Sequence, residues 1–215
     1  MAPLRSVREE LANAITHGLG LLASIAAGAV LVVLASLRGD SWQIVAVSIY
    51  AASLVILYSA STVYHAARSP ELKARLKIFD HCAIFGLIAG TYTPFTLGAM
   101  RGGWGWTLFA VVWGLAVSGI TVKLFFTGRQ RLLSTFCYLA MGWMGLIALT
   151  PLQLALPSSA LVWIVAGGLT YSVGTLFYLN RRVPYGHAIW HLFVLGGSAC
   201  HFMAVLQQLT PYVPV

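Results

Sequence analysis

The stretch HGLGLLASIAAGAVLVVLASL, residues 17–37, decides the fold. It contains no Asp, Glu, Lys or Arg, and it has the length of about 20 residues that an α-helix needs to cross the hydrocarbon core of a bilayer. The run is too long for the apolar part of a signal peptide, and no convincing cleavage site follows it, so we expect no cleaved leader. The stretch therefore predicts a membrane-spanning helix.

Six more apolar runs of similar length follow in the 215-residue chain. Hydrophobic residues make up 59% of the chain and charged residues 8%, which is more apolar surface than a soluble domain needs. We predict an all-α integral membrane protein, a seven-transmembrane helix bundle whose short connections make sequential helices antiparallel. The expected spans are 17–37, 43–66, 78–99, 105–126, 132–150, 158–179 and 187–207. Within the third, Pro94 should kink or end the helix.

The distribution of positive charge predicts the orientation. The formal net charge is +8, but the basic residues lie in short loops and form no binding stripe, so we expect no nucleic-acid partner. Most of the 13 Lys and Arg residues fall on the side of the N-terminus, and the positive-inside rule then places the N-terminus in the cytoplasm and the C-terminus outside. On the inner side we count Arg5, Arg8, Arg68, Lys73, Arg75, Lys77, Lys123, Arg129, Arg131, Arg181 and Arg182, and on the outer side Arg38 and Arg101.

These observations divide the chain into three parts. We expect a cytoplasmic amphipathic N-terminal segment, residues 1–16, a seven-span membrane domain, residues 17–207, and a short external tail, residues 208–215.

Polar residues from separate spans should meet near the cytoplasmic face. His65 ends the second span, Asp80 begins the third, and His187 and His191 begin the seventh. Because helix positions i and i+4 share one face, His187 and His191 can reach a single metal ion. With His65 they supply three nitrogen ligands, the pattern of a catalytic zinc site that keeps a fourth position for water. Iron and manganese accept similar ligands.

Two further residues are candidates for catalysis. Ser61 lies one turn from His65 and could hydrogen-bond a ligand or a substrate oxygen, although serine also bonds its own helix. Asp80 could act as a general base or complete the metal coordination, and its simpler role is to pair with Lys77 or to cap its helix. For His65 alone, the simpler role is that of a polar residue at the membrane interface.

The other histidines and the cysteines have weaker patterns. His81 is about 100° around the helix from Asp80, so we expect it beside the site or at the interface. His201 is about 15 Å beyond His191 along a helix, so it should bond another span in the outer half. Cys82, near Asp80, is an alternative thiolate ligand. The remaining residues are Cys137 and Cys200, expected in the apolar core, and Glu10, Asn13 and His17, which share one helix face and either close the site or form a polar cap.

Several of these residues form an ordered set of motifs. They are Glu10-x-x-Asn13-x-x-x-His17, Ser61-x-x-x-His65, the run 80–95 (DHCAIFGLIAGTYTPF), Gly186-His187-x-x-x-His191 and His201-Phe202. The set resembles the haemolysin III branch of the progestin and adiponectin receptor family, within a wider group of seven-span proteins that includes alkaline ceramidases.

The resemblance implies a zinc ion held by the counterparts of His65, His187 and His191, with Asp80 near the metal-bound water and Ser61 beside the site. Eukaryotic relatives are linked to ceramide hydrolysis or to sensing of hormones and lipids, and bacterial members to haemolysis and membrane-fluidity homeostasis. The leading hypothesis is a zinc-dependent intramembrane hydrolase of a lipid amide or ester bond in a bacterial inner membrane. The alternatives are a non-enzymatic homeostasis or lipid-sensing protein with structural zinc, and a pore-forming cytolysin.

Overall fold

The structure, a computed structural model, describes residues 7–126, 131–180 and 182–210, and all regular secondary structure in these residues is helical. Seven of its helical segments are long and apolar enough to cross a membrane, as the sequence predicts. Four parts of the chain lie outside the described residues: residues 127–130 of the predicted connection 127–131, Arg181, the start of the N-terminal segment and the end of the predicted tail. The elements are α1 (Val7–Arg38), α2 (Ser41–Ala66), α3 (Pro70–Thr93), η1 (Pro94–Ala99), α4 (Gly103–Phe126), α5 (Arg131–Gly142), η2 (Met144–Ala148), α6 (Leu149–Ala155), α7 (Ser158–Leu179) and α8 (Gly186–Leu209).

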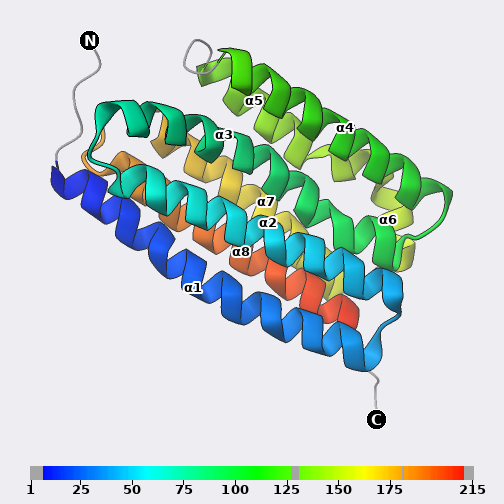
Figure 1. The fold of residues 1–215 in the computed structure, drawn as a ribbon. Coiled ribbons are helices and arrows are strands. Elements are labelled where there is room, and N and C mark those ends of the chain that lie inside the picture. Colours follow the sequence, from blue (N-terminus) through cyan, green and yellow to red (C-terminus); the bar gives the residue numbers. More distant parts are fainter. Residues whose placement is uncertain (1–6, 127–130, 181, 211–215) are drawn as a thin grey trace.

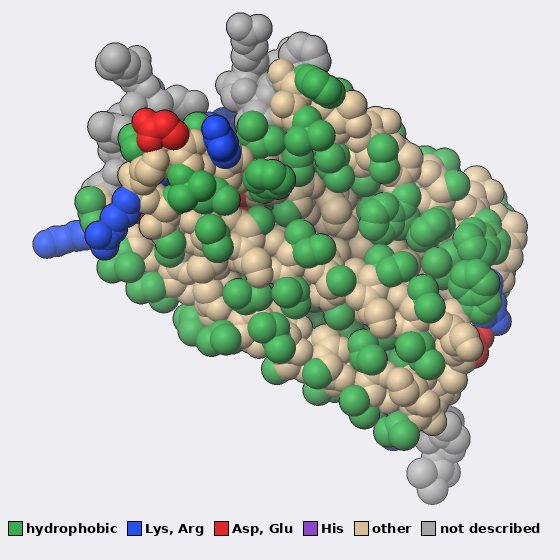
Figure 2. All heavy atoms as spheres, in the orientation of Figure 1, with side chains coloured by type: hydrophobic (Ala, Val, Ile, Leu, Met, Phe, Trp, Pro, Cys, Tyr) green, Lys and Arg blue, Asp and Glu red, His purple; other side chains and the backbone are tan. Residues whose placement is uncertain are grey.

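The surface of the bundle is that of a membrane protein. On the face shown in Figure 2, hydrophobic side chains are spread along the length of the bundle, whereas Lys, Arg, Asp and Glu side chains gather at its two ends. Large apolar residues such as Leu22 and Leu176 are about two-thirds exposed. Contiguous apolar surface of this kind is rare on soluble monomers and is the expected covering of a protein whose solvent is lipid. The chain is therefore an integral membrane protein.

The helices pack in a defined order around the bundle. Helix α2 lies between α1 and α3, and α8 packs against both α1 and α7 (Figure 1). Helix α4 packs on the outer side of α3, and α5 contacts α3 and α7. Because the number of spans is odd, α1 begins and α8 ends at opposite ends of the bundle. The beginnings of α1, α3 and α8 thus share one end with the end of α2, which we call the histidine end.

One stripe of α1 fixes how it packs against its neighbours. The buried stripe is polar near its start, at Asn13 and His17, and then continues with small residues. At Gly28 a Cβ atom would lie 2.8 Å from the Cβ of Ala51, so the two backbones approach closely only because a glycine is present. Close packing along the stripe places the polar start of α1 against the end of α2 and the start of α8.

The third span changes its hydrogen bonding at Pro94, as the sequence predicts. The α-helix ends at Thr93, and the chain continues as a π-helix over Pro94–Ala99, closed by a bond from the Met100 N–H to the Phe95 carbonyl at 2.8 Å. Proline cannot donate to the preceding turn, so a wider helix accommodates the missing bond.

The fifth span is broken, which the sequence analysis does not predict. It consists of α5, the 3₁₀ turn η2 and the short helix α6, so that the segment 149–155 is helical where a connection from residue 151 is expected. The Tyr92 hydroxyl of α3 donates to the Gly142 carbonyl at 2.6 Å and accepts from the Gly145 N–H at 2.9 Å. This side chain therefore satisfies backbone groups that the break releases inside the membrane.

Helix boundaries also differ from expectation at the polar ends. Helix α1 begins at Val7, well before the expected start of the first span, and α3 begins at Pro70, with the Ser69 side chain accepting from the Leu72 N–H as its N-cap. Asp80 consequently lies about three turns inside α3 rather than at its start. The membrane boundaries of these helices stay those predicted from the sequence.

At the opposite end, Asp40 caps α2. Its side chain accepts from the Gln43 N–H at 2.9 Å and from the Arg101 guanidinium at 2.7 Å. These bonds, the Gln43 N–H first, hold the pKa of Asp40 below its ordinary value.

Candidate metal centre

Three histidines converge at the histidine end of the bundle. His65 ends α2, and His187 and His191 occupy the first two turns of α8. One ligand atom of each lies within 4.8 Å of those of the other two, and the ring centroids are 4.6 to 5.1 Å apart. His65 and His191 are buried, and His187 is half-buried. The three could bind one metal ion, and this grouping is the one that the sequence analysis predicts.

Hydrogen bonds of the Nδ1 atoms orient two of the three imidazole rings. His65 Nδ1 lies 2.8 Å from Glu10 Oε2, and His191 Nδ1 lies 3.2 Å from the Asn13 carbonyl oxygen. Because a carboxylate and a carbonyl oxygen only accept, Nδ1 carries the proton in both rings. The lone pair is then on Nε2, and this tautomer can bind a metal ion through Nε2. A histidine that binds a metal usually donates its other N–H to a carboxylate or a carbonyl oxygen, as these two do.

Both acceptors, the Glu10 carboxylate and the Asn13 carbonyl, belong to α1. Glu10 also accepts from Lys73 Nζ at 2.9 Å, so it joins α1, α2 and α3. Glu9 Oε1 accepts from the N–H of Tyr185 at 3.2 Å. Tyr185 has a φ of 54°, a left-handed conformation uncommon for a residue with a side chain, and it directly precedes α8. The first turn of α1 therefore holds both His65 and the start of the helix that carries the other two histidines.

Two buried polar residues of α1 lie against the centre. The His17 ring stacks on His191 with centroids 3.5 Å apart and meets Tyr58 edge-on at 5.0 Å. Asn13 is 1% exposed. Within the described parts of the chain, neither ring nitrogen of His17 and neither polar side-chain atom of Asn13 has a hydrogen-bond partner. The sequence left two roles open for these residues, and this arrangement fits residues that close one side of the site better than a polar helix cap.

The predicted catalytic residues face the same region. Asp80 and Ser61 line one cavity together with His187 and His191. Ser61 is 1% exposed, one turn from His65, and Asp80 Oδ2 lies 3.6 Å from His81 Nδ1. Among the described residues, the group with metal-ligand spacing consists of the three histidines and does not include Asp80. The catalytic roles of Ser61 and Asp80 stay predictions.

His81, His201 and Cys82 do not belong to this group. His81 Nδ1 donates to the Lys77 carbonyl at 2.7 Å. His201 lies in the other half of the bundle, where its ring stacks on Tyr171 of α7. Cys82 has its sulfur 3.9 Å from the Ile120 carbonyl oxygen and is not in the metal group.

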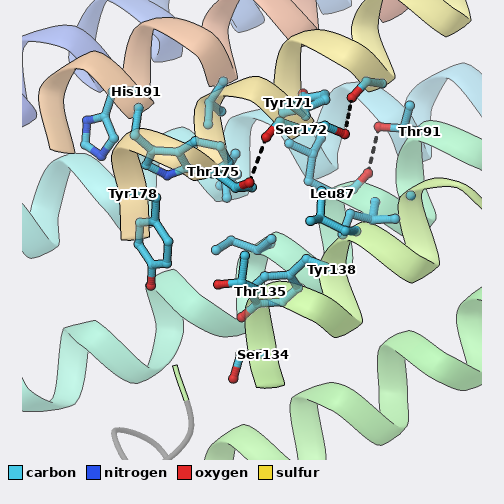
Figure 3. A pocket seen from close by; sticks show the side chains of 18 of the residues that line it. Leu87, Thr91, Ser134, Thr135, Tyr138, Tyr171, Ser172, Thr175, Tyr178 and His191 are labelled. Carbon is cyan, nitrogen blue, oxygen red and sulfur yellow. Dashed lines mark hydrogen bonds between the residues drawn. The ribbon is translucent and has the colours of Figure 1, made fainter. Parts of the chain in front are cut away.

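A large cavity extends from the metal centre into the bundle. Its volume is about 950 Å³, and its wall runs from Asp80 and His187 to His201 in the other half of the bundle. Side chains of α5, including Thr135 and Tyr138, lie across it from Tyr171, Ser172 and Thr175 of α7 (Figure 3). Apolar residues predominate in the remainder of the wall, among them Leu57, Ile84, Leu87, Ile88, Leu139, Leu152, Leu161 and Val194.

Sequence reasoning missed three groups that the structure places here. They are Lys73, which contacts Glu10, Tyr58, which contacts His17, and Thr16, which contacts His191. Tyr58 follows the helical spacing of Ser61 and His65, so this periodicity could have identified it. The contacts of Lys73 and Thr16 depend on how α1 packs against other helices, and the sequence carries no signal for them.

Comparison with known proteins agrees with these motifs. Residues 5–202 match the family model described as haemolysin-III related. The chain is 49% identical to the Hemolysin-3 homolog of Bacillus subtilis over 201 residues, 94% of each protein, and 47% identical to Hemolysin-3 of Bacillus cereus over 205 residues, 95% of this chain and 94% of that protein. It is 28% identical to the human monocyte to macrophage differentiation factor over 213 residues, 94% of this chain and 84% of that protein. The chain belongs to the haemolysin III-related family of seven-span membrane proteins.

Proposed function

We propose that this protein is a zinc-dependent hydrolase that cleaves an amide or ester bond of a membrane lipid and thereby contributes to lipid homeostasis. The observation that supports this most directly is the juxtaposition of two metal-ligand candidates, His187 and His191, with Asp80 on the wall of one large apolar cavity. A volume of about 950 Å³ is at the upper end of the range for small-molecule sites, as a lipid chain requires. Polar groups at one end and apolar walls beyond match the chemistry of a lipid.

Each residue then has a defined part in the reaction. His65, His187 and His191 hold the zinc ion, whose contribution is to make a water molecule more acidic and to polarise the lipid carbonyl. The Asp80 carboxylate takes the proton of the attacking water and passes it to the leaving nitrogen or oxygen. The Ser61 hydroxyl donates a hydrogen bond to the carbonyl oxygen of the lipid. Glu10 and the Asn13 carbonyl keep two of the imidazoles in the ligating tautomer.

The charge distribution supports a location for this chemistry. Most Lys and Arg residues lie on the side that includes the histidine end, so the proposed reaction meets the cytoplasmic leaflet. The similarity to Bacillus proteins supports a bacterial cytoplasmic membrane.

An Asp80→Asn variant tests the mechanism. The purified protein is incubated with bacterial lipid extract, and fatty acid and lyso-lipid or amine products are followed by mass spectrometry, with zinc measured in parallel. We expect the variant to retain zinc and to lose at least about a hundredfold in turnover, because general-base catalysis contributes that much. Asp40→Asn, at the other end of the bundle, is the control and should keep full activity. Undiminished hydrolysis by Asp80→Asn rules out the role given to that carboxylate.

A second candidate is a non-enzymatic homeostasis or sensing protein whose zinc is structural. The bonds from Glu10 to His65 and Lys73 favour it, because they tie three helices together around the metal centre. In that case chelation lowers the thermal stability of the protein, and no lipid product forms with any extract.

A third candidate follows from the names of the Bacillus relatives, which are called hemolysins. A lytic protein would release dye from vesicles that contain it. Leakage that persists in a His187→Ala variant, in which the proposed metal site is broken, would favour lysis over the hydrolase.

A further inference from the structure

Four basic residues line the cavity at the histidine end. They come from different parts of the chain, which are the first half of α3, the end of α4, the start of α5 and the segment between α7 and α8. The positive-inside rule explains why basic residues are at this end, but it does not explain why they face an internal cavity. Arg68 and Arg75, at the same end, are exposed and do not line it. The four are Lys77, Lys123, Arg131 and Arg182.

Lys123 faces inward and lines the cavity. It lies within the last turn of α4, from which a lysine side chain can normally extend to the aqueous interface. Instead it is 7% exposed, the one buried Lys or Arg side chain in the described ranges, and its Nζ donates to the Ser134 hydroxyl at the start of α5. Both residues line the cavity, so the ammonium group of Lys123 is part of its wall.

Arg131 places a positive charge close to the metal centre. Its guanidinium carbon lies 4.1 Å from the centroid of the Tyr178 ring, and that ring is 5.8 Å from the ring of His187. One aromatic side chain therefore separates the guanidinium from a metal-ligand candidate. Tyr178 and Ser134 are both visible at this end of the cavity (Figure 3).

Two of these cations, Lys77 and Arg131, form no ion pair with a carboxylate among the described residues. The chain has five Asp and Glu residues, and all are among the described residues. Within the described residues, no carboxylate oxygen lies within 4 Å of Lys77 or Arg131. Glu10, which also lines the cavity, is paired with Lys73 and His65. Lys77, Lys123 and Arg131 are all close enough to His81 for their charges to act on its ring.

We propose that Lys77, Lys123 and Arg131 bind the phosphate group of an anionic lipid whose acyl chain lies in the cavity. Arginine and lysine bind phosphate oxygens through charge-assisted hydrogen bonds. The apolar wall takes the chain, and the bond to be cleaved lies between chain and phosphate, beside the three histidines. This inference rests on the proposed function for the cleavage step, but the binding itself does not require turnover.

Lipid binding to purified protein in detergent, measured by native mass spectrometry, tests the proposal. The two probes are phosphatidylglycerol and a diacylglycerol with the same acyl chains, which lacks the phosphate. We expect the wild-type protein to bind phosphatidylglycerol at least about tenfold more tightly, and a Lys123→Gln/Arg131→Gln double variant to lose roughly tenfold in that affinity for each cation removed. The matched control, Arg68→Gln/Arg75→Gln, removes two charges from the same end outside the cavity and should bind like the wild type.

The outcomes separate this inference from the proposed function. Equal affinity for the two probes, or an equal loss in both double variants, overturns it even if the protein hydrolyses lipids. Preferential binding that the Lys123→Gln/Arg131→Gln variant loses supports it even if no product is ever found. Inorganic phosphate that raises the melting temperature as much as phosphatidylglycerol would show a site for free phosphate and overturn the lipid assignment. Lys77→Gln, at a half-buried position, repeats the test if the double variant does not fold.

Discussion

The bond between Glu10 and His65 gives the sharpest test of the metal centre. A Glu10→Gln variant keeps the shape of the side chain and can still accept one neutral hydrogen bond, but it removes the charge that faces His65 Nδ1 at 2.8 Å and Lys73 Nζ at 2.9 Å. Loss of such a support behind a ligating histidine typically costs 10- to 100-fold in metal affinity. Because the Glu10 side chain is 20% exposed, water replaces part of the interaction, so we expect roughly tenfold for Glu10→Gln and a value nearer 100-fold for Glu10→Ala.

The assay is zinc competition with a chromogenic chelator on detergent-purified protein, with bound metal checked by elemental analysis. Glu71→Gln is the matched control, because Glu71 is an exposed carboxylate in the first turn of α3 that accepts from the Ser69 hydroxyl and does not touch the histidines. It should bind zinc like the wild type. Wild-type affinity in both Glu10 variants would refute the argument that this carboxylate orients His65, and an equal loss in Glu71→Gln would show a general effect of charge.

Three further predictions follow from the centre and from the packing of α1. A His187→Ala/His191→Ala variant should contain almost no zinc, whereas His201→Ala, remote from the centre, should retain the wild-type content; equal content in the first variant and the wild type would disprove the site. Chelation should lower the melting temperature of the wild type but not of that double variant, since a ligand at a hundredfold above its Kd stabilises by about 2.7 kcal/mol. Gly28→Ala should destabilise by about 1–3 kcal/mol in denaturant titrations, because its Cβ would lie 2.8 Å from that of Ala51, whereas Gly18→Ala, with 3.7 Å to its nearest neighbour, should not.

The membrane-spanning helices were predictable because each must be apolar over its whole length, a requirement that leaves a signal in every run. The π-helix after Thr93 was partly predictable, since Pro94 removes a donor. The break in the fifth span was not. Gly142 and Gly145 resemble the small residues of any close helix contact, and the hydroxyl that stabilises the break belongs to Tyr92 on another helix.

The three histidines were predictable for a different reason. The spacing of His187 and His191 places them on one face, and the alternation of spans brings His65 to the same end of the bundle. The bond from Glu10 to His65 was not predictable, because it requires the register of α1 against α2. That register is set by contacts such as Gly28 against Ala51, which lie far along the helix from the site. Motif spacing thus identified the ligand candidates, and tertiary packing determined their supports.

The buried polar residues beside the centre bear on whether a metal ion bound there would be catalytic or structural. Asn13 and His17 are 1% and 4% exposed, line the cavity, and have no hydrogen-bond partner for their side-chain polar atoms among the described residues. Each unsatisfied buried polar group destabilises the fold by about 1–3 kcal/mol. Around a closed structural metal site, apolar neighbours would therefore stabilise the fold better than these polar residues do. Groups of this kind are retained where a polar molecule enters and completes their hydrogen bonds. Their position beside His191 therefore supports the proposal of a catalytic centre that admits water and the polar part of a substrate.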